Sequence, residues 1–309
     1  MKTSKLAATL GIALALITVE SCSLSIDGKT IKPSNKYVTK KIELSDIGSI
    51  KSSTSIDVIY TQTSGKTYAE IYAPDNIIPY VKVHQNGDKL EVGYNFPKGE
   101  SLSIRGKYEC EVKVFAPEVT AFATSSSSDI TLASPLKTDK DVTLTTSSSG
   151  DIDAGRIQCK NLNIQTSSSG DIAIKDVTCR VLEASTSSSG DLKIDEARCN
   201  EASLHSSSSG DCQIQSLSCA GSVQALTGSS GDIRLSGQCA TAEYSSQSSG
   251  SIYAQDLKAA QVSASASSGG DILCHATESL SVSTSSGGEI RYAGNPRQVT
   301  GKSENVSKL

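Results

Sequence analysis

The heptapeptide TSSSGDI at residues 146–152 returns at 166–172 and, as TSSSGDL, at 186–192. Related copies are TSSSSDI at 124–130, SSSSGDC at 206–212, TGSSGDI at 227–233, SQSSGSI at 246–252, ASSGGDI at 266–272 and TSSGGEI at 284–290. The penultimate position of the copies falls at 129, 151, 171, 191, 211, 232, 251, 271 and 289, at intervals of 18 to 22 residues. A period this regular is the signature of a repeat protein built from stacked units.

Apolar and polar residues alternate between these markers. In the copy that starts at Asp171, Ile172 and Ile174 point to one side of the chain, and Ala173 and Lys175 point to the other. A period of two without helical spacing predicts strands, and about 20 residues are too few for a strand, a helix and their loops. We therefore predict an all-β chain that forms a right-handed, parallel β-helix-like solenoid with coils of about 20 residues.

Three apolar columns are expected inside such a solenoid, because equivalent positions of successive coils lie above one another. The first column is Ile152, Ile172, Leu192, Cys212, Ile233, Ile252, Ile272 and Ile290; the second is Ala154, Ile174, Ile194, Ile214, Leu235 and Ala254; the third is Ile157, Val177, Ala197, Leu217 and Leu257. The position after the first column has no common chemistry, as expected of a solvent face.

Gly-Asp pairs mark the corners of the predicted coils: Gly150 and Asp151, Gly170 and Asp171, Gly190 and Asp191, Gly210 and Asp211, Gly231 and Asp232. We expect each glycine to supply a positive φ and each aspartate to accept backbone N–H bonds around the corner. A calcium ladder of stacked aspartates is the alternative. The Ser/Thr runs fit a tight corner and a narrow core, with half of the hydroxyls bonded inside the coil. A hydroxyl array that templates ice or a glycan is the second alternative.

Five of the nine cysteines recur about every 20 residues and should form a column: Cys159, Cys179, Cys199, Cys219 and Cys239. Compact buried thiols explain such a column without chemistry. Export would favour disulfides between neighbouring coils, and a soft-metal site is a third reading. The sequence has no C-x-x-C motif that would support metal binding or redox chemistry, and we predict no cofactor.

The N-terminal sequence is typical of an export signal. Lys2 and Lys5 precede an apolar run of 14 residues from Leu6 to Val19, which is too short to span a bilayer comfortably. Cys22 follows small Ser21 as in a bacterial lipobox, although Glu20 departs from that pattern; an ordinary secretory signal is the alternative. We predict a signal peptide at 1–21 and a lipidated tether at 22–40, anchored to the membrane by acyl chains on Cys22.

Residues 41–115 hold less regular alternating runs, with a hairpin turn predicted at Asn86-Gly87. We read this segment as irregular β coils or a cap, because solenoid ends must be covered, and residues 116–300 as the regular SSGDI repeats. The order of signal, alternating strands with I-D-V-x-Y at 56–60, and S-G-D-I coils resembles the putative auto-transporter adhesin, head GIN domain family over about residues 40–290. That resemblance implies a single β-solenoid at 41–300 and a role in surface adhesion, and it supplies no catalytic residues.

The composition and the motifs argue against several classes of function. There are 29 Lys and Arg against 33 Asp and Glu, so no basic excess favours nucleic acid. His84, His205 and His275 lie in unrelated registers, and no G-x-S-x-G, P-loop or H-E-x-x-H motif occurs. We expect a non-enzymatic lipoprotein of the bacterial envelope, on the outer membrane and facing the periplasm or the cell surface. It would bind a glycan or protein through the solenoid surface. A polysaccharide-active β-helix enzyme and a purely structural envelope protein are the alternatives.

Overall fold

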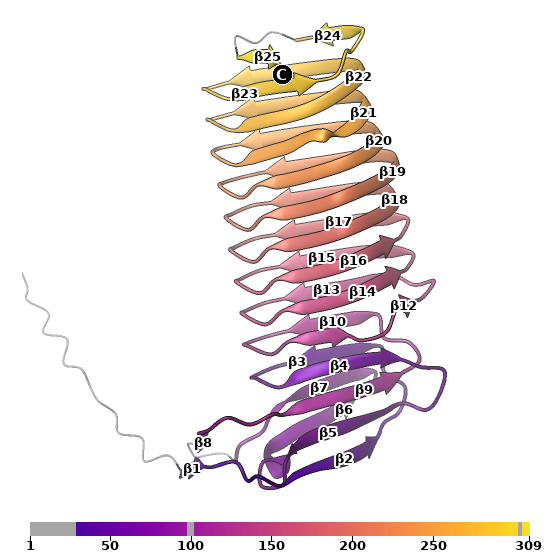
Figure 1. The fold of residues 1–309 in the computed structure, drawn as a ribbon, viewed down its shortest axis with the longest axis vertical. Helices are drawn as coiled ribbons and strands as arrows, with labels where there is room; N and C mark the ends of the chain where they lie inside the picture. Colours follow the sequence, from indigo (N-terminus) through magenta and orange to yellow (C-terminus); the bar gives the residue numbers. More distant parts are fainter. Residues whose placement is uncertain (1–28, 98–101, 302–304) are drawn as a thin grey trace, which may run out of the picture.

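The computed structural model describes residues 29–97, 102–301 and 305–309, which form an elongated rod of β-strands (Figure 1). Cys22 and the predicted signal peptide lie outside these ranges. The described residues contain no α-helix and one 3₁₀ turn, Ile78–Tyr80, and no helix among them is long and apolar enough to cross a membrane. The all-β solenoid predicted from the repeat is therefore confirmed.

The strands divide into a cap at one end of the rod, residues 29–116, and the regular coils above it. The cap strands are β1 (Lys29–Ile31), β2 (Tyr37–Glu43), β3 (Ser49–Ser52), β4 (Asp57–Gln62), β5 (Tyr68–Pro74), β6 (Val81–Asn86), β7 (Lys89–Tyr94), β8 (Leu102–Ile104) and β9 (Glu111–Ala116). The coil strands are β10 (Ala121–Thr124), β11 (Ile130–Leu132), β12 (Leu136–Lys137), β13 (Val142–Thr146), β14 (Ile152–Gln158), β15 (Asn161–Thr166), β16 (Ile172–Thr178), β17 (Val181–Thr186), β18 (Leu192–Ser206), β19 (Cys212–Thr227), β20 (Ile233–Gln247), β21 (Ser251–Ser267), β22 (Asp271–Ser285), β23 (Glu289–Ala293), β24 (Gln298–Thr300) and β25 (Val306–Lys308).

Each regular coil contributes one strand to each of two parallel ladders. β14 pairs with β16, and β16 with β18, along the first ladder, whereas β15 pairs with β17 along the second. From β18 to β22 the two strands of a coil run on as one bent element of 15 to 17 residues. Side chains therefore alternate between a narrow interior and two outer faces, which we call the first face and the second face after the strand of the coil that presents them.

The predicted columns are present in the interior. Ile152 pairs with Ile172, Ile172 with Leu192, and the same register continues to Ile290; all members are at most 1% exposed. The third column holds one residue that we had not placed there, because Gly237 stands between Leu217 and Leu257. Burying each Leu or Ile side chain contributes about 1.5–3 kcal/mol, and only stacking can bury it.

The cap begins with a coil and then departs from the solenoid. β3 and β4 pair in parallel with β10 and β11, so residues 49–62 form the coil beneath the first regular one. The chain then builds β5 to β9. β7 and β9 extend the two ladders in parallel beneath β3 and β4, whereas β5 runs antiparallel to β2 and β9, and β6 runs antiparallel to β7. The predicted hairpin is present, but its two-residue loop is Gly87 and Asp88 and not Asn86 and Gly87, because Asn86 pairs with Lys89; φ at Gly87 is +62°.

One predicted boundary is wrong. We expected residues 22–40 to be a tether, but β1 pairs with β8, and β2, which starts at Tyr37, pairs with β5 along its whole length. The lysines and polar residues of this segment suggested a solvated linker. They are compatible with an edge strand, because one face and one edge of β2 remain open to water.

Candidate functional site

The stacked corners explain the Gly-Asp pairs, but by a different mechanism from the one we predicted. None of the five corner glycines has a positive φ, so that expectation is wrong. Glycine is needed because the corners approach one another closely: a Cβ on Gly170 would lie 2.3 Å from the carbonyl oxygen of Gly150, and one on Gly190 would lie 2.3 Å from that of Gly170. The requirement comes from the coil below and not from the local dihedral angle.

Buried hydroxyls line the inner side of the same corners. Thr146 Oγ1 donates to the carbonyl of Gly170 at 2.9 Å, and Thr166 repeats the bond to Gly190 at 3.0 Å. The next hydroxyl turns outward, and Ser167 Oγ donates to the carbonyl of Thr146 at 3.1 Å. These bonds satisfy backbone acceptors that would otherwise be orphaned at each corner, so the inward half of the predicted hydroxyl pattern is structural.

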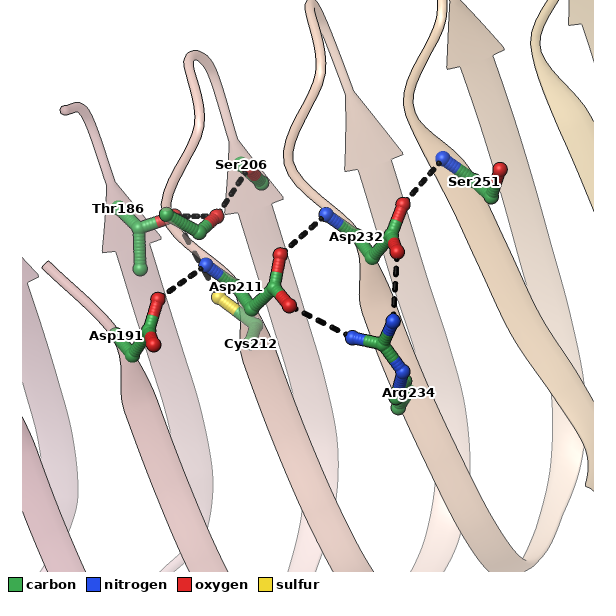
Figure 2. A network of polar contacts seen from close by, with 9 residues as sticks. Thr186, Asp191, Ser206, Asp211, Cys212, Asp232, Arg234 and Ser251 are labelled. Carbon is green, nitrogen blue, oxygen red and sulfur yellow. Dashed lines mark hydrogen bonds and ion pairs between the residues drawn. The ribbon is translucent and has the colours of Figure 1, made fainter. Parts of the chain in front are cut away.

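The corner aspartates form a ladder along the rod (Figure 2). One carboxylate oxygen of each aspartate accepts the backbone N–H of the corresponding residue in the next coil, so the partner lies in the neighbouring coil and not around the same corner. The ladder runs through Asp57, Asp129, Asp151, Asp171, Asp191, Asp211 and Asp232 to Ser251, with N···O distances of 2.8–3.1 Å.

Arg234 binds the upper end of this ladder. Its guanidinium donates to Asp211 and to Asp232 at 2.7 Å each (Figure 2). It also lies 5.0 Å from the ring centroid of Tyr253. Within the described ranges, no group of three or more His, Cys, Asp or Glu side chains is arranged to hold a metal ion. The inter-coil N–H bonds account for the aspartates without a cation.

The predicted cysteine column is present, and its thiols are free in the structure. Cys159, Cys179, Cys199 and Cys219 are buried, and Cys239 is half-buried. Burial raises the pKa of the Cys159 thiol to about 12 and that of Cys179 to about 11. Cys199 and Cys219 are register partners. The hydrogen bond from Cys199 lowers the pKa of Cys219 to about 7 and raises the pKa of Cys199.

The three histidines are not brought together. His84 lies on β6, His205 on β18 and His275 on β22. Charged side chains of the first face instead form ion pairs between coils, as where Asp176 accepts from Arg156 at 3.0 Å and from Arg198 at 3.2 Å. Such exposed pairs are typical of a solvated surface and resemble neither an acid–base pair nor a nucleophile with its base.

The site that sequence reasoning missed is a shallow groove on the second face, toward the C-terminal end. It measures about 780 Å³ and crosses β19 to β22 and β24. Two exposed columns line it: Ser222, Thr241, Gln261, Ser279 and Gln298 in one register, and Gln224, Glu243, Ser263, Ser281 and Thr300 in the other. We call this surface the polar groove. Its signal was present, because both columns repeat at the coil period and only Glu243 is charged.

Comparisons with known proteins identify one family and several solved structures with a similar fold. The family described as putative auto-transporter adhesin, head GIN domain, matches residues 48–226 and 218–296. No curated protein matches the chain. Two structures from Parabacteroides distasonis, described as a putative adhesin and a putative lipid binding protein, have TM-scores of 0.57 and 0.58; each is 21% identical, over 91% of this chain and 100% of the other.

A putative adhesin from Parabacteroides merdae has a TM-score of 0.51 at 21% identity, with the same coverage of both chains. These likenesses concern the fold alone. The family match spans most of the described coils and includes the corner ladder, the cysteine column and the polar groove as far as Ser281. This chain therefore belongs to the putative auto-transporter adhesin, head GIN domain family.

Proposed function

We propose that this protein is a non-enzymatic adhesin of the bacterial envelope, held to the membrane by lipid on Cys22, whose polar groove binds a glycan. The observation that carries the proposal is the groove itself: two parallel columns of hydroxyl and amide side chains on a rigid sheet. Sugars present the complementary hydrogen-bonding groups, and a preorganised polar surface with a single charged side chain, Glu243, loses little conformational entropy on binding them. The adhesin descriptions of the family and of the similar structures support a binding role.

The groove also lies far from the proposed anchor. Its strands are the upper coils of the rod, whereas the first described strand, β1, lies at the opposite end (Figure 1). A ligand site at the end away from the membrane suits adhesion. A protein ligand is the second candidate, because the open face would also accept a flat partner surface.

Binding to an array of envelope and host glycans tests the proposal. Gln261→Ala with Ser263→Ala removes two hydrogen-bonding side chains from the centre of the groove. At about 0.5–1.5 kcal/mol for each lost bond, we expect roughly tenfold weaker binding. The matched control is Asn161→Ala with Asn163→Ala, in the same two registers on β15. Equal loss in both double variants, or no glycan bound by the parent protein, would contradict the glycan assignment. Protein binding that the groove variant abolishes would support adhesion with the other ligand class.

The anchor is tested separately by metabolic labelling with a fatty acid. Lipid should be incorporated into the parent protein and not into Cys22→Ser, because an acyl chain requires the cysteine at the predicted cleavage site. An unlabelled parent protein would contradict the lipoprotein assignment and leave the glycan measurement unaffected.

A further inference from the structure

The cap and the coils of the rod carry opposite net charge. Residues 29–115 contain 13 Lys and Arg against 10 Asp and Glu, whereas residues 116–309 contain 14 against 21. The cap therefore has a formal charge of +3 and the coils −7, although the whole chain is only −4. Because the cap occupies one end of the long axis (Figure 1), the molecule is an electrostatic dipole along that axis.

The positive charge is concentrated where the described chain begins. Residues 29–41 read KTIKPSNKYVTKK, with five lysines and no acidic residue. All five are exposed: Lys29, Lys32, Lys36, Lys40 and Lys41. We call these five lysines the basic end.

Some of this charge is locally neutralised and some is not. Lys36 lies 3.7 Å from Asp75, and Lys41 lies 3.3 Å from Glu43. For the other three lysines of the basic end, no carboxylate of a described residue lies within 4.0 Å. They are free to meet an external anion.

Aromatic side chains lie beside the basic end. Tyr37 stacks on Tyr72 at a centroid distance of 5.1 Å, and Tyr68 stacks on Phe115 at 4.6 Å. The ammonium of Lys41 lies 3.9 Å from the Tyr68 ring centroid. These rings are half-buried on the outer side of the sheet that β2, β5 and β9 form. Tyrosine with a polar tip beside lysine is the combination that suits a membrane–water interface.

The basic end is also an edge within reach of the proposed anchor. β1 pairs with β8 alone, and β2 pairs with β5 alone, so no second strand among the described residues pairs with either of them. Cys22 precedes Lys29 by seven residues, and an extended chain of that length spans at most about 24 Å. A lipid on Cys22 would therefore hold the basic end close to the headgroups.

We propose that the basic end docks on the anionic headgroups of the membrane and that this contact orients the rod. The proposal rests on the lipid anchor of the proposed function. Lysines near an anionic leaflet are attracted to it, whereas the acidic coils are repelled, and the two effects act together along one axis. The rod then stands away from the bilayer and presents the polar groove at its far end.

Vesicle binding tests the docking without the acyl chain. The protein from residue 22 onward with Cys22→Ser keeps every described residue and carries no lipid. We expect it to sediment with phosphatidylcholine vesicles that contain about 30% phosphatidylglycerol, not with phosphatidylcholine alone, and to be released at about 0.5 M NaCl. Replacing Lys29, Lys32 and Lys40 with Gln should weaken vesicle binding by up to about a hundredfold.

The matched control replaces Lys137, Lys160 and Lys175 with Gln, which changes the charge equally at exposed positions along the coils. Circular dichroism establishes that both triple variants are folded. Equal weakening by the two triple variants would overturn the proposal, as would equal binding to neutral vesicles or no binding by the parent. Failure of the lipid labelling described above would leave this measurement unchanged, so loss of the anchor and loss of the docking surface are distinguishable.

Discussion

At the residue scale, the lack of a Cβ atom determines which residue a corner can hold. The corner glycines have ordinary dihedral angles, and it is the absent Cβ that lets one corner approach the carbonyl of the corner below it. The threonine beside each corner then uses its hydroxyl for a buried carbonyl, as between Thr166 and Gly190. Small size thus explains the glycine of TSSSGD, and hydrogen bonding explains its threonine.

Gly190→Ala should therefore destabilise the protein strongly. The new Cβ would lie 2.3 Å from the carbonyl oxygen of Gly170, so two coils must shift; we expect a loss of about 1–3 kcal/mol in the free energy of unfolding. Gly155→Ala is the control, because no atom lies within 4 Å of its added Cβ. Urea unfolding followed by circular dichroism measures both. Similar midpoints for the two variants would show that corner contact is not the constraint.

At the element scale, the coils are held together by bonds between neighbouring coils. Backbone ladders join successive strands, and the aspartate ladder adds a side-chain bond at every corner from Asp57 to Asp232. Each aspartate uses one oxygen for the next coil, and Arg234 binds the second oxygens of the last two (Figure 2). A row of like charges is therefore tolerated because each charge accepts an N–H and the upper two carboxylates share the positive charge of Arg234.

Replacing Asp171 measures how much the side-chain bond of the aspartate ladder contributes to stability, beyond the backbone ladders. Asp171→Ala removes the acceptor for the N–H of Asp191, now bonded at 2.8 Å, and should cost about 0.5–1.5 kcal/mol. Asp171→Asn keeps an acceptor oxygen and should cost less. Thermal unfolding of both variants is compared with that of Asp195→Ala, which removes a half-buried carboxylate that lies outside the ladder and 3.9 Å from Lys193 Nζ. The ladder has no stabilising role if Asp171→Ala unfolds at the same temperature as Asp195→Ala.

At the scale of the whole molecule, the fold is close to one-dimensional. Each coil contacts mainly its two neighbours, so stability is approximately a sum over coils and their interfaces. The cap closes one end with antiparallel strands, and β24 and β25 lie over β22 and β23 at the other. The charge dipole and the position of the polar groove are properties of the whole molecule, because no single coil has either of them.

Deleting one whole coil should accordingly be tolerated. Removing residues 171–190 joins Gly170 to Asp191 and restores a Gly-Asp corner in the correct register, so we expect a folded protein with a modestly lower melting temperature. Removing residues 171–180 alone places the sequence of a second-face strand where a first-face strand belongs. That variant should lose its cooperative β signal in circular dichroism and aggregate in size-exclusion chromatography. Equal behaviour of the two deletions would contradict the additive picture.

The sequence by itself determined the repeat, the strand alternation, the buried columns and the cysteine column. These follow from spacing, and a parallel stack places residues of equal spacing in contact. The tertiary structure alone decided the rest. Both the carbonyl that requires a corner glycine and the N–H that binds an aspartate belong to the neighbouring coil. They cannot be predicted from the sequence of the turn alone. The strand at Tyr37–Glu43 needed β5 as a partner. The polar groove and the separation of charge between the cap and the coils arose only when the coils were stacked along one axis, because both are sums over residues far apart in the chain.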